Sequence, residues 1–258
     1  MKYLYTNYPK QYGQFLYFKN RLFTLPKLIF LNLGFKVYFG SKDQDQWVIE
    51  EIFNFKRSGY FVDLAATNGL FENNTFILEK KYKWSGLAIE PNVSFFRALK
   101  RIRKCKVLND VILTDNSDIK FFENGPTGGI LGYEYDNNLQ KRSKLINKNS
   151  SKIVSKKTKS LSAILKENNA PKIIDYLSLD VEGAETAIMK NFSFMDYIFL
   201  SMTIERPTKE LNGLLFNNGY IFIKNHKADS FYLHNTLYQK IKDKIYCEPF
   251  SQIPTKKW

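Results

Sequence analysis

The sequence contains two cysteines, and they lie far apart. Cys105 and Cys247 match neither the short spacing of a metal-binding or redox motif nor the framework of a disulfide-rich secreted domain. Zinc fingers, thioredoxin-like redox sites and disulfide-stapled scaffolds are therefore excluded. The two thiols are expected to be buried or incidental, as is usual in a reducing compartment.

A long uninterrupted apolar run is also missing. The best candidate, residues 16–34, is broken by Lys19, Arg21, Pro26 and Lys27, and it carries no cleavage-site pattern. We therefore expect a soluble cytoplasmic protein without a transmembrane segment. With 258 residues, 44% of them hydrophobic and 16% aromatic, the chain can bury one large core.

Acidic residues are fewer than basic ones, 25 against 39, and the formal net charge is +14. A polyanionic partner would fit this charge, but the chain is rich in Lys and Asn rather than Arg, which a codon bias alone would produce. No acid occurs between Asp136 and Glu167, where the basic residues include Lys141, Arg142, Lys144, Lys148, Lys152, Lys156, Lys157 and Lys159. This stretch is either a solvated mobile loop or a rim that steers anions.

Glycine is scarce where a dinucleotide-binding loop would need it. Residues 59–69 form an apolar run that passes Asp63 and small residues before a helical pattern, but of the G-x-G-x-x-G signature only Gly69 is present. A pyrophosphate site is therefore disfavoured. A second strand, residues 86–89, ends at Glu90, which can accept hydrogen bonds from both ribose hydroxyls. A ribose-bearing ligand without phosphate fits, and S-adenosylmethionine is the common one; a tight turn without a ligand is the alternative.

Acids follow four predicted strands. Besides Asp63 and Glu90, Asp180 follows the apolar run 173–179 and Glu205 follows 197–204. Because the carboxyl ends of parallel strands meet at one edge of a sheet, these acids are expected to face one crevice. Each acid alone would also be explained as a helix N-terminal cap.

The remaining pattern predicts the organisation of the chain. Residues 1–40 read as an aromatic N-terminal extension, and 41–258 as one domain with an irregular basic insertion at about 125–159. Helical spacing is found at 41–55, 75–82, 93–103 and 160–168, and further strands at 106–111 and 119–122. Residues 219–224 and 231–234 suggest an antiparallel hairpin. If its first strand runs parallel to the others, His226 and Asp229 lie at the ligand edge.

Several segments of the chain, taken together, resemble one protein family. They are Asp45-Gln46-Trp47, Gly59 to Asp63, Asn74-Thr75 with Leu78-Glu79, Trp84 to Pro91, Leu177 to Glu185, and Thr203 to Pro207. The combination is similar to the FkbM-type S-adenosylmethionine-dependent methyltransferases. The resemblance implies an α/β, Rossmann-like class I methyltransferase fold: a mostly parallel seven-stranded sheet with helices on both faces and the C-terminal hairpin. Where the family usually has Asp-x-Gly-Ala, this chain has Ala65.

The implied activity is O-methylation of a carbohydrate, sugar-nucleotide or glycolipid acceptor, including an anionic one. The expected cofactor contacts are Asp63, Ala65, Asn68, Gly69, Glu90, Pro91, Asp110, Val111 and Asp180. An acceptor hydroxyl needs a base, for which Asp180, Glu205 and His226 are the candidates. Asp180 and Glu205 could instead hold Mg²⁺ or Mn²⁺; the sequence leaves both roles open.

Two other functions compete with methyl transfer. The basic stretch and the aromatic content would suit a nucleic-acid-binding or RNA-modifying protein, but an RNP-type strand, an Arg-rich helix and an N/D-P-P-Y/F motif are all missing from the sequence. We therefore do not expect nucleic acid as the partner. A catalytically inactive module of the same fold is the other alternative, and binding of S-adenosylmethionine separates it from the enzyme.

Overall fold

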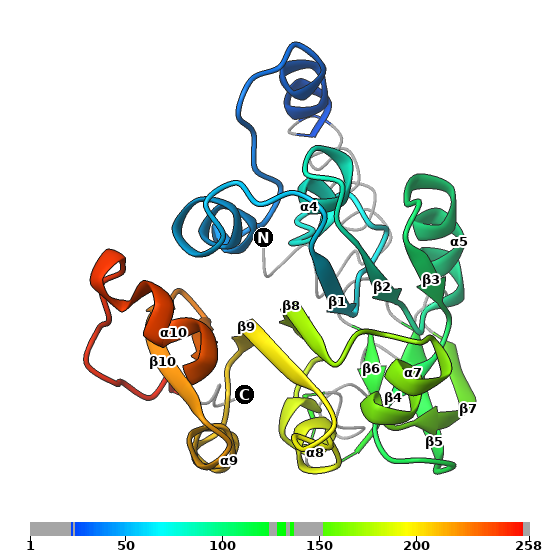
Figure 1. The fold of residues 1–258 in the computed structure, drawn as a ribbon. Coiled ribbons are helices and arrows are strands. Elements are labelled where there is room, and N and C mark those ends of the chain that lie inside the picture. The colour runs from blue at the N-terminus through cyan, green and yellow to red at the C-terminus, as the bar shows by residue number, and fades with distance from the viewer. Residues whose placement is uncertain (1–21, 23, 124–127, 133–134, 137–151, 255–258) are drawn as a thin grey trace.

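The computed structural model describes residues 22, 24–123, 128–132, 135–136 and 152–254. Its main feature is a seven-stranded sheet with the strand order β10-β11-β9-β8-β1-β2-β3 (Figure 1). Strands β1, β2, β3, β8 and β9 pair in parallel, whereas β11 is antiparallel to both β9 and β10. This confirms the predicted fold class, including the C-terminal hairpin.

The strands of this sheet are β1 (Tyr60–Leu64), β2 (Ser85–Ile89), β3 (Lys106–Leu108), β8 (Ile173–Leu179), β9 (Ile198–Glu205), β10 (Tyr220–His226) and β11 (Asp229–His234). The helices are α3 (Gln44–Gln46), η1 (Trp47–Ile52), α4 (Phe76–Lys80), α5 (Val93–Ile102), α7 (Leu161–Glu167), α8 (Glu185–Lys190), α9 (Lys209–Asn217), α10 (Asn235–Ile241) and η2 (Lys242–Lys244). A further helix covers residues 24–32.

Helices cover both faces of the sheet, because alternate strand residues point to opposite sides. On one face, Val62, Leu64, Leu177 and Leu179 form a core with apolar residues of α7, α8 and α9. On the other, Phe61 and Tyr176 pack with η1 and α4, and α10 contacts the same cluster. The sheet is therefore buried on both sides, as its nearly continuous apolar strands predict.

A second, four-stranded sheet follows β3, with the order β4-β7-β5-β6. Its strands are β4 (Val111–Ile112), β5 (Asp118–Glu123), β6 (Gly129–Ile130) and β7 (Lys152–Lys159). The strand predicted at 106–111 is thus split, since Lys106–Leu108 joins the large sheet and Val111 the small one.

The end of the basic stretch is a strand rather than the irregular insertion that we predicted. Strand β7 pairs with β5 over six residues and with β4 at its end, so it lies inside the small sheet. Its many lysines hid the strand pattern, since few apolar residues alternate there. The more N-terminal part of the basic stretch, with Lys141, Arg142, Lys144 and Lys148, lies outside the described residues, as do residues 1–21 of the predicted extension.

No helix within the described part of the chain is both long and apolar enough to cross a membrane.

Candidate active site

A cavity of about 590 Å³ opens at the carboxyl edge of the parallel strands. The four acids predicted to meet at this edge, Asp63, Glu90, Asp180 and Glu205, all line it. The strand register explains this, because Leu64, Ile89, Leu179 and Ile204 are aligned in neighbouring strands. Of the other predicted contacts, Ala65, Asn68, Pro91, Asp110 and Val111 also line the cavity.

The cavity is acidic although the protein is basic. Seven acids line it, whereas Lys42 is the one basic residue among the described lining residues. The seven are Asp63, Glu72, Glu90, Asp110, Asp180, Glu182 and Glu205. Low-dielectric walls focus the field of such a cluster, so the cavity favours cations and repels anions.

Glu90 lies at the end of β2 and is almost completely buried. Its two carboxylate oxygens accept hydrogen bonds from the backbone amides of Thr67, at 2.8 Å, and Asn92, at 2.7 Å. Burial raises the pKa of Glu90 to about 7. Because each oxygen has a second lone pair, Glu90 can still accept hydrogen bonds from a ligand in the cavity.

Asp63 organises the loop that follows β1. Its carboxylate accepts hydrogen bonds from Asn73, at 3.0 Å, and from the Thr75 hydroxyl, at 2.7 Å. Burial raises the pKa of Asp63, while these bonds and the guanidinium of Arg103 oppose the shift. The buried Arg103 in turn bonds Asn73, Thr75 and Glu79. Arg103 was not among the site residues predicted from the sequence, although Thr75 and Glu79 belong to the segments that resemble the family.

The loop at 65–69 contains three residues with positive φ. Ala65, Thr67 and Gly69 have φ of 64°, 49° and 76°. Gly69 is not among the cavity-lining residues, and a Cβ there would lie 2.4 Å from Leu99 of α5. Its structural role is thus to let the loop pack against that helix, and a direct cofactor contact stays a prediction.

Replacing Ala65 by glycine is expected to stabilise the protein. Left-handed backbone costs a residue with a Cβ roughly 1–2 kcal/mol, and the greater freedom of an unfolded glycine offsets part of the gain. Ala65→Gly should therefore raise the free energy of unfolding by about 0.5–1 kcal/mol, measured as a higher urea midpoint at unchanged slope. The control, Ala163→Gly in helix α7, should lower it by about 1 kcal/mol. Equal destabilisation by both changes would contradict the strain assigned to Ala65.

Asp180 follows β8 directly and is exposed where it lines the cavity. Asp180 does not make the helix cap considered as its alternative role, because Ala184 is the N-cap of α8 and that N-terminus has no side-chain cap hydrogen bond. The amides of Val181 and Gly183 donate to Glu185, at 2.9 and 3.3 Å, and Glu185 is the first residue of α8. Capping therefore does not account for an acid at position 180.

Asp180 and Glu205 form an interacting pair of carboxyl groups. Burial in the crevice, followed by repulsion from Glu205 and Glu182, raises the pKa of Asp180 well above its usual range. Since the side chain remains exposed to the cavity, we give repulsion the greater weight. Burial alone would raise the pKa of Glu205 too, but Lys42 and Arg206 outweigh it and lower that pKa. Of the two carboxyls, Asp180 therefore binds a proton more readily than Glu205.

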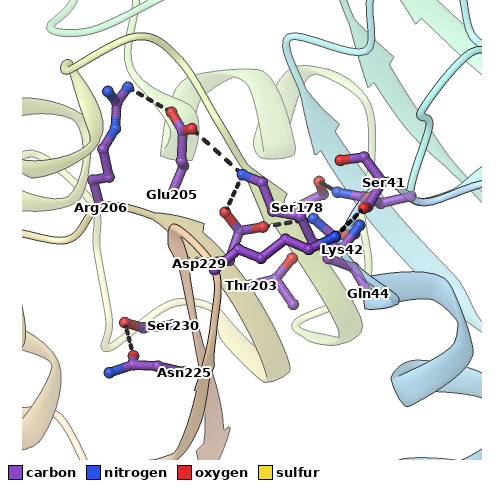
Figure 2. Close-up of polar contacts among 12 residues, drawn as sticks. Ser41, Lys42, Gln44, Ser178, Thr203, Glu205, Arg206, Asn225, Asp229 and Ser230 are labelled. Atoms are coloured by element: carbon purple, nitrogen blue, oxygen red, sulfur yellow. Dashed lines mark hydrogen bonds and ion pairs between the residues drawn. The ribbon is translucent and has the colours of Figure 1, made fainter. Parts of the chain in front are cut away.

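Lys42 joins two acids from neighbouring strands, Glu205 of β9 and Asp229 of β11 (Figure 2). Its ammonium lies 2.5 Å from Asp229 and 3.4 Å from Glu205, and Gln44 donates to the second oxygen of Asp229 at 2.5 Å. On the other side of Glu205, Arg206 lies at 2.6 Å. Lys42 was not among the site residues predicted from the sequence. The sequence feature that could have pointed to Lys42 is the neighbouring segment Asp45-Gln46-Trp47. Asp45 accepts a hydrogen bond from the Phe39 amide and so fixes the turn that carries Lys42.

His226 lies at the same sheet edge but in a different cavity. Strand β10 is parallel to the others, as the prediction required, yet β11 separates it from β9. Two strand spacings are about 10 Å, and His226 lines a cavity of about 180 Å³ that it shares with Lys42. The structure therefore brings Asp180 and Glu205 together and places His226 apart from them.

The described residues do not favour a metal site. None of their His, Cys, Asp and Glu side chains form a group of three or more that could hold an ion. Glu205, one of the two predicted ligands, already makes ion pairs with Lys42 and Arg206. The role of Asp180 and Glu205 as ligands of Mg²⁺ or Mn²⁺ is thus not supported.

Solved structures with some similarity to the chain include three methyltransferases. The METTL16 MTase domain is 14% identical at a TM-score of 0.39, covering 74% of this chain and 65% of that one. A methyltransferase from Pyrococcus furiosus is 13% identical at 0.37, covering 88% and 99%. Precorrin-6y C5,15-methyltransferase from Geobacter metallireducens GS-15 is 9% identical at 0.35, covering 73% and 84%. This chain thus spans slightly less than two thirds of the METTL16 structure.

No curated protein matches the sequence. The model of the methyltransferase FkbM domain, in contrast, matches residues 63–222, which is more than half of the chain and extends from Asp63 near the end of β1 through β2, β8 and β9 with their acids. A match to this family implies S-adenosylmethionine as the methyl donor. The chain therefore belongs to the FkbM methyltransferase family.

Proposed function

We propose that this protein transfers a methyl group from S-adenosylmethionine to a hydroxyl of a carbohydrate or glycoconjugate, with Asp180 as the general base. The observation that carries the proposal is the acidic cavity in a protein of net charge +14. A phosphate-bearing cofactor would be repelled there. A cofactor with a sulfonium and an ammonium group is attracted instead.

The residues at the two ends of the cavity fit this cofactor. Glu90 would hold the ribose, because its carboxylate keeps acceptor capacity beyond its two backbone hydrogen bonds. Ile89, Phe95 and Val111 provide apolar lining near the same end for an adenine ring. The cofactor, when bound, supplies an electrophilic methyl group. Asp180 and Glu205 lie at the ends of β8 and β9, which β1 separates from β2, and there the acceptor would meet that group.

Asp180 would then take the proton of the attacking hydroxyl. A raised pKa makes Asp180 a stronger base than an ordinary aspartate, which suits proton transfer from a weakly acidic hydroxyl. Glu205 would remain ionised beside Lys42 and Arg206, and its negative charge would stabilise the proton that Asp180 accepts. The hydroxyl oxygen forms a bond to the methyl carbon, the bond from that carbon to sulfur breaks, and the proton ends on Asp180.

A neutral, polyhydroxylated acceptor is supported better than nucleic acid. Several acceptor groups and the Lys42 ammonium face this part of the cavity, and sugars match such sets of hydrogen-bonding partners. A polyanion would have to bring its phosphates beside Asp180, Glu182 and Glu205. Neutral sugar hydroxyls would not be repelled by these carboxylates.

Removal of the Lys42 charge is expected to shift the pH dependence of methyl transfer. Lys42 lowers the pKa of both Asp180 and Glu205. In Lys42→Met both carboxyls should therefore require higher pH to ionise, so that the acidic limb of the kcat profile moves upward. Lys240→Met, an exposed change on α10, is the control. An acidic limb at the same pH in Lys42→Met and the control would argue against coupling of Lys42 to the base.

The acceptor class can be tested with trideuteromethyl-labelled S-adenosylmethionine and a panel of glycans that have free hydroxyls. We expect label on oxygen, located by mass spectrometry and NMR, and much less label with Asp180→Asn. Parallel reactions with RNA and with peptides test the alternatives. Label on nitrogen, or label on RNA alone, would overturn the proposal.

A further inference from the structure

An exposed apolar patch lies on the N-terminal segment that precedes the first strand of the large sheet. It consists of Leu22, Leu25, Ile29, Phe30, Leu33 and Phe35, of which Leu33 is 67% and Leu22 59% exposed. Four of them, at positions 22, 25, 29 and 33, follow helical spacing and share one side of the helix at 24–32. In Figure 1 this helix, in dark blue, projects beyond α4 and away from the sheet.

The opposite side of the same helix holds it to the protein. Leu28 and Leu31 are half-buried and pack against the core cluster of η1 and α4. The Lys81 ammonium also binds the carbonyl of Phe35, at 3.1 Å. The patch is therefore the outer face of an attached helix. An exposed apolar face of this kind is typical of a binding surface.

The charge around the patch indicates the kind of partner. Within the described residues 22 and 24–41, the charged side chains are Lys27 and Lys36, and no acid is present. Lys36, Lys80 and Lys83 are exposed on the segments next to the patch, and the Lys36 ammonium lies 4.6 Å from the centre of the Phe55 ring. Lys36 also makes an ion pair with Glu50 at 3.4 Å, but its side chain is 64% exposed and surface ion pairs of this kind are weak, so its charge stays available to a negative surface. Leucine and phenylalanine bordered by lysine suit the boundary between lipid headgroups and acyl chains.

We propose that the patch and its lysines bind the surface of an anionic lipid bilayer. The apolar side chains would enter the outer part of the acyl layer, while Lys36, Lys80 and Lys83 would face the negative headgroups. Both contributions are needed, because a short apolar face alone gives weak membrane binding. This proposal is independent of the acceptor chemistry.

Co-sedimentation of the full chain with vesicles tests the proposal. Vesicles of phosphatidylcholine with phosphatidylglycerol should retain the protein, and pure phosphatidylcholine vesicles should retain much less. Ile29→Glu with Leu33→Glu should weaken binding to the anionic vesicles at least tenfold. Replacement of Lys36, Lys80 and Lys83 by Gln should also weaken it and reduce its sensitivity to salt.

The matched control places two glutamates elsewhere on the surface. Met195→Glu with Tyr246→Glu changes the net charge equally at side chains that are 97% and 78% exposed, and it should retain binding far better. Thermal melting of each variant verifies folding. Equal loss in both double variants, or no binding by the wild type, would overturn the proposal. It would also be overturned if the patch joined two copies, seen as a dimer in light scattering that Ile29→Glu converts to a monomer.

Discussion

Asp180→Asn is expected to lower kcat roughly 100-fold or more, the usual scale for loss of general-base catalysis. The substitution keeps the size of the side chain and most of its hydrogen bonding but removes its charge and basicity. Affinity for S-adenosylhomocysteine should change little, because ribose recognition is assigned to Glu90 at the other end of the cavity. Single-turnover methyl transfer and calorimetric binding measure the two effects separately.

Asp243→Asn is the matched control, since Asp243 is exposed in η2 and does not line the cavity. It should retain the wild-type kcat. Normal turnover by Asp180→Asn would show that Asp180 is not the base, and Glu205 would then be the next candidate.

The pH dependence of stability offers a second test of Asp180 that does not depend on activity. Its pKa is raised in the folded state, so the folded protein binds more protons than the unfolded chain over the range between the two pKa values. Ionised Asp180 therefore destabilises the fold increasingly as the pH rises through its folded pKa. Asp180→Asn should raise the melting temperature at alkaline pH, with a difference that shrinks toward acidic pH. A residue needed only for structure would give a lower melting temperature.

The second large effect is expected at Glu90. Loss of a charged hydrogen-bond partner costs about 1.5–3 kcal/mol, so Glu90→Ala should weaken S-adenosylhomocysteine binding roughly 10- to 150-fold. Calorimetry at a pH above the raised pKa of about 7 measures this with the carboxylate ionised. Glu90→Gln, which keeps acceptor capacity at one oxygen, should lose less.

The control for Glu90 is Glu167→Ala, because Glu167 is exposed and pairs only with Lys159 among the described ion pairs. Its affinity should match that of the wild type. If Glu90→Ala also binds as tightly as the wild type, the ribose site assigned to the end of β2 is wrong.

The position of the site could be predicted from the sequence because it depends on strand ends. Apolar runs of strand length followed by acids define the edge of a parallel sheet, and the register then brings Asp63, Glu90, Asp180 and Glu205 to one cavity. No knowledge of side-chain conformation was needed. The hairpin was predictable for the same reason, from two strand patterns joined by a short polar loop.

Other parts of the site depend on contacts that a local pattern does not contain. Lys42 reaches Asp229 across 187 residues of sequence, and Arg103 completes the support of Asp63 from the far end of α5. His226 was placed at the right edge, but its distance from Glu205 depended on which hairpin strand pairs with β9. The strand β7 was hidden because four of its eight residues are lysine, which leaves little apolar alternation.

The most direct test of the central claim is a crystal structure of the protein with S-adenosylhomocysteine. We expect the ligand in the acidic cavity, with both ribose hydroxyls within hydrogen-bond distance of Glu90 and with the sulfur directed toward the space beside Asp180 and Glu205. The claim would be contradicted by a ligand bound elsewhere, or by one whose sulfur points away from Asp180.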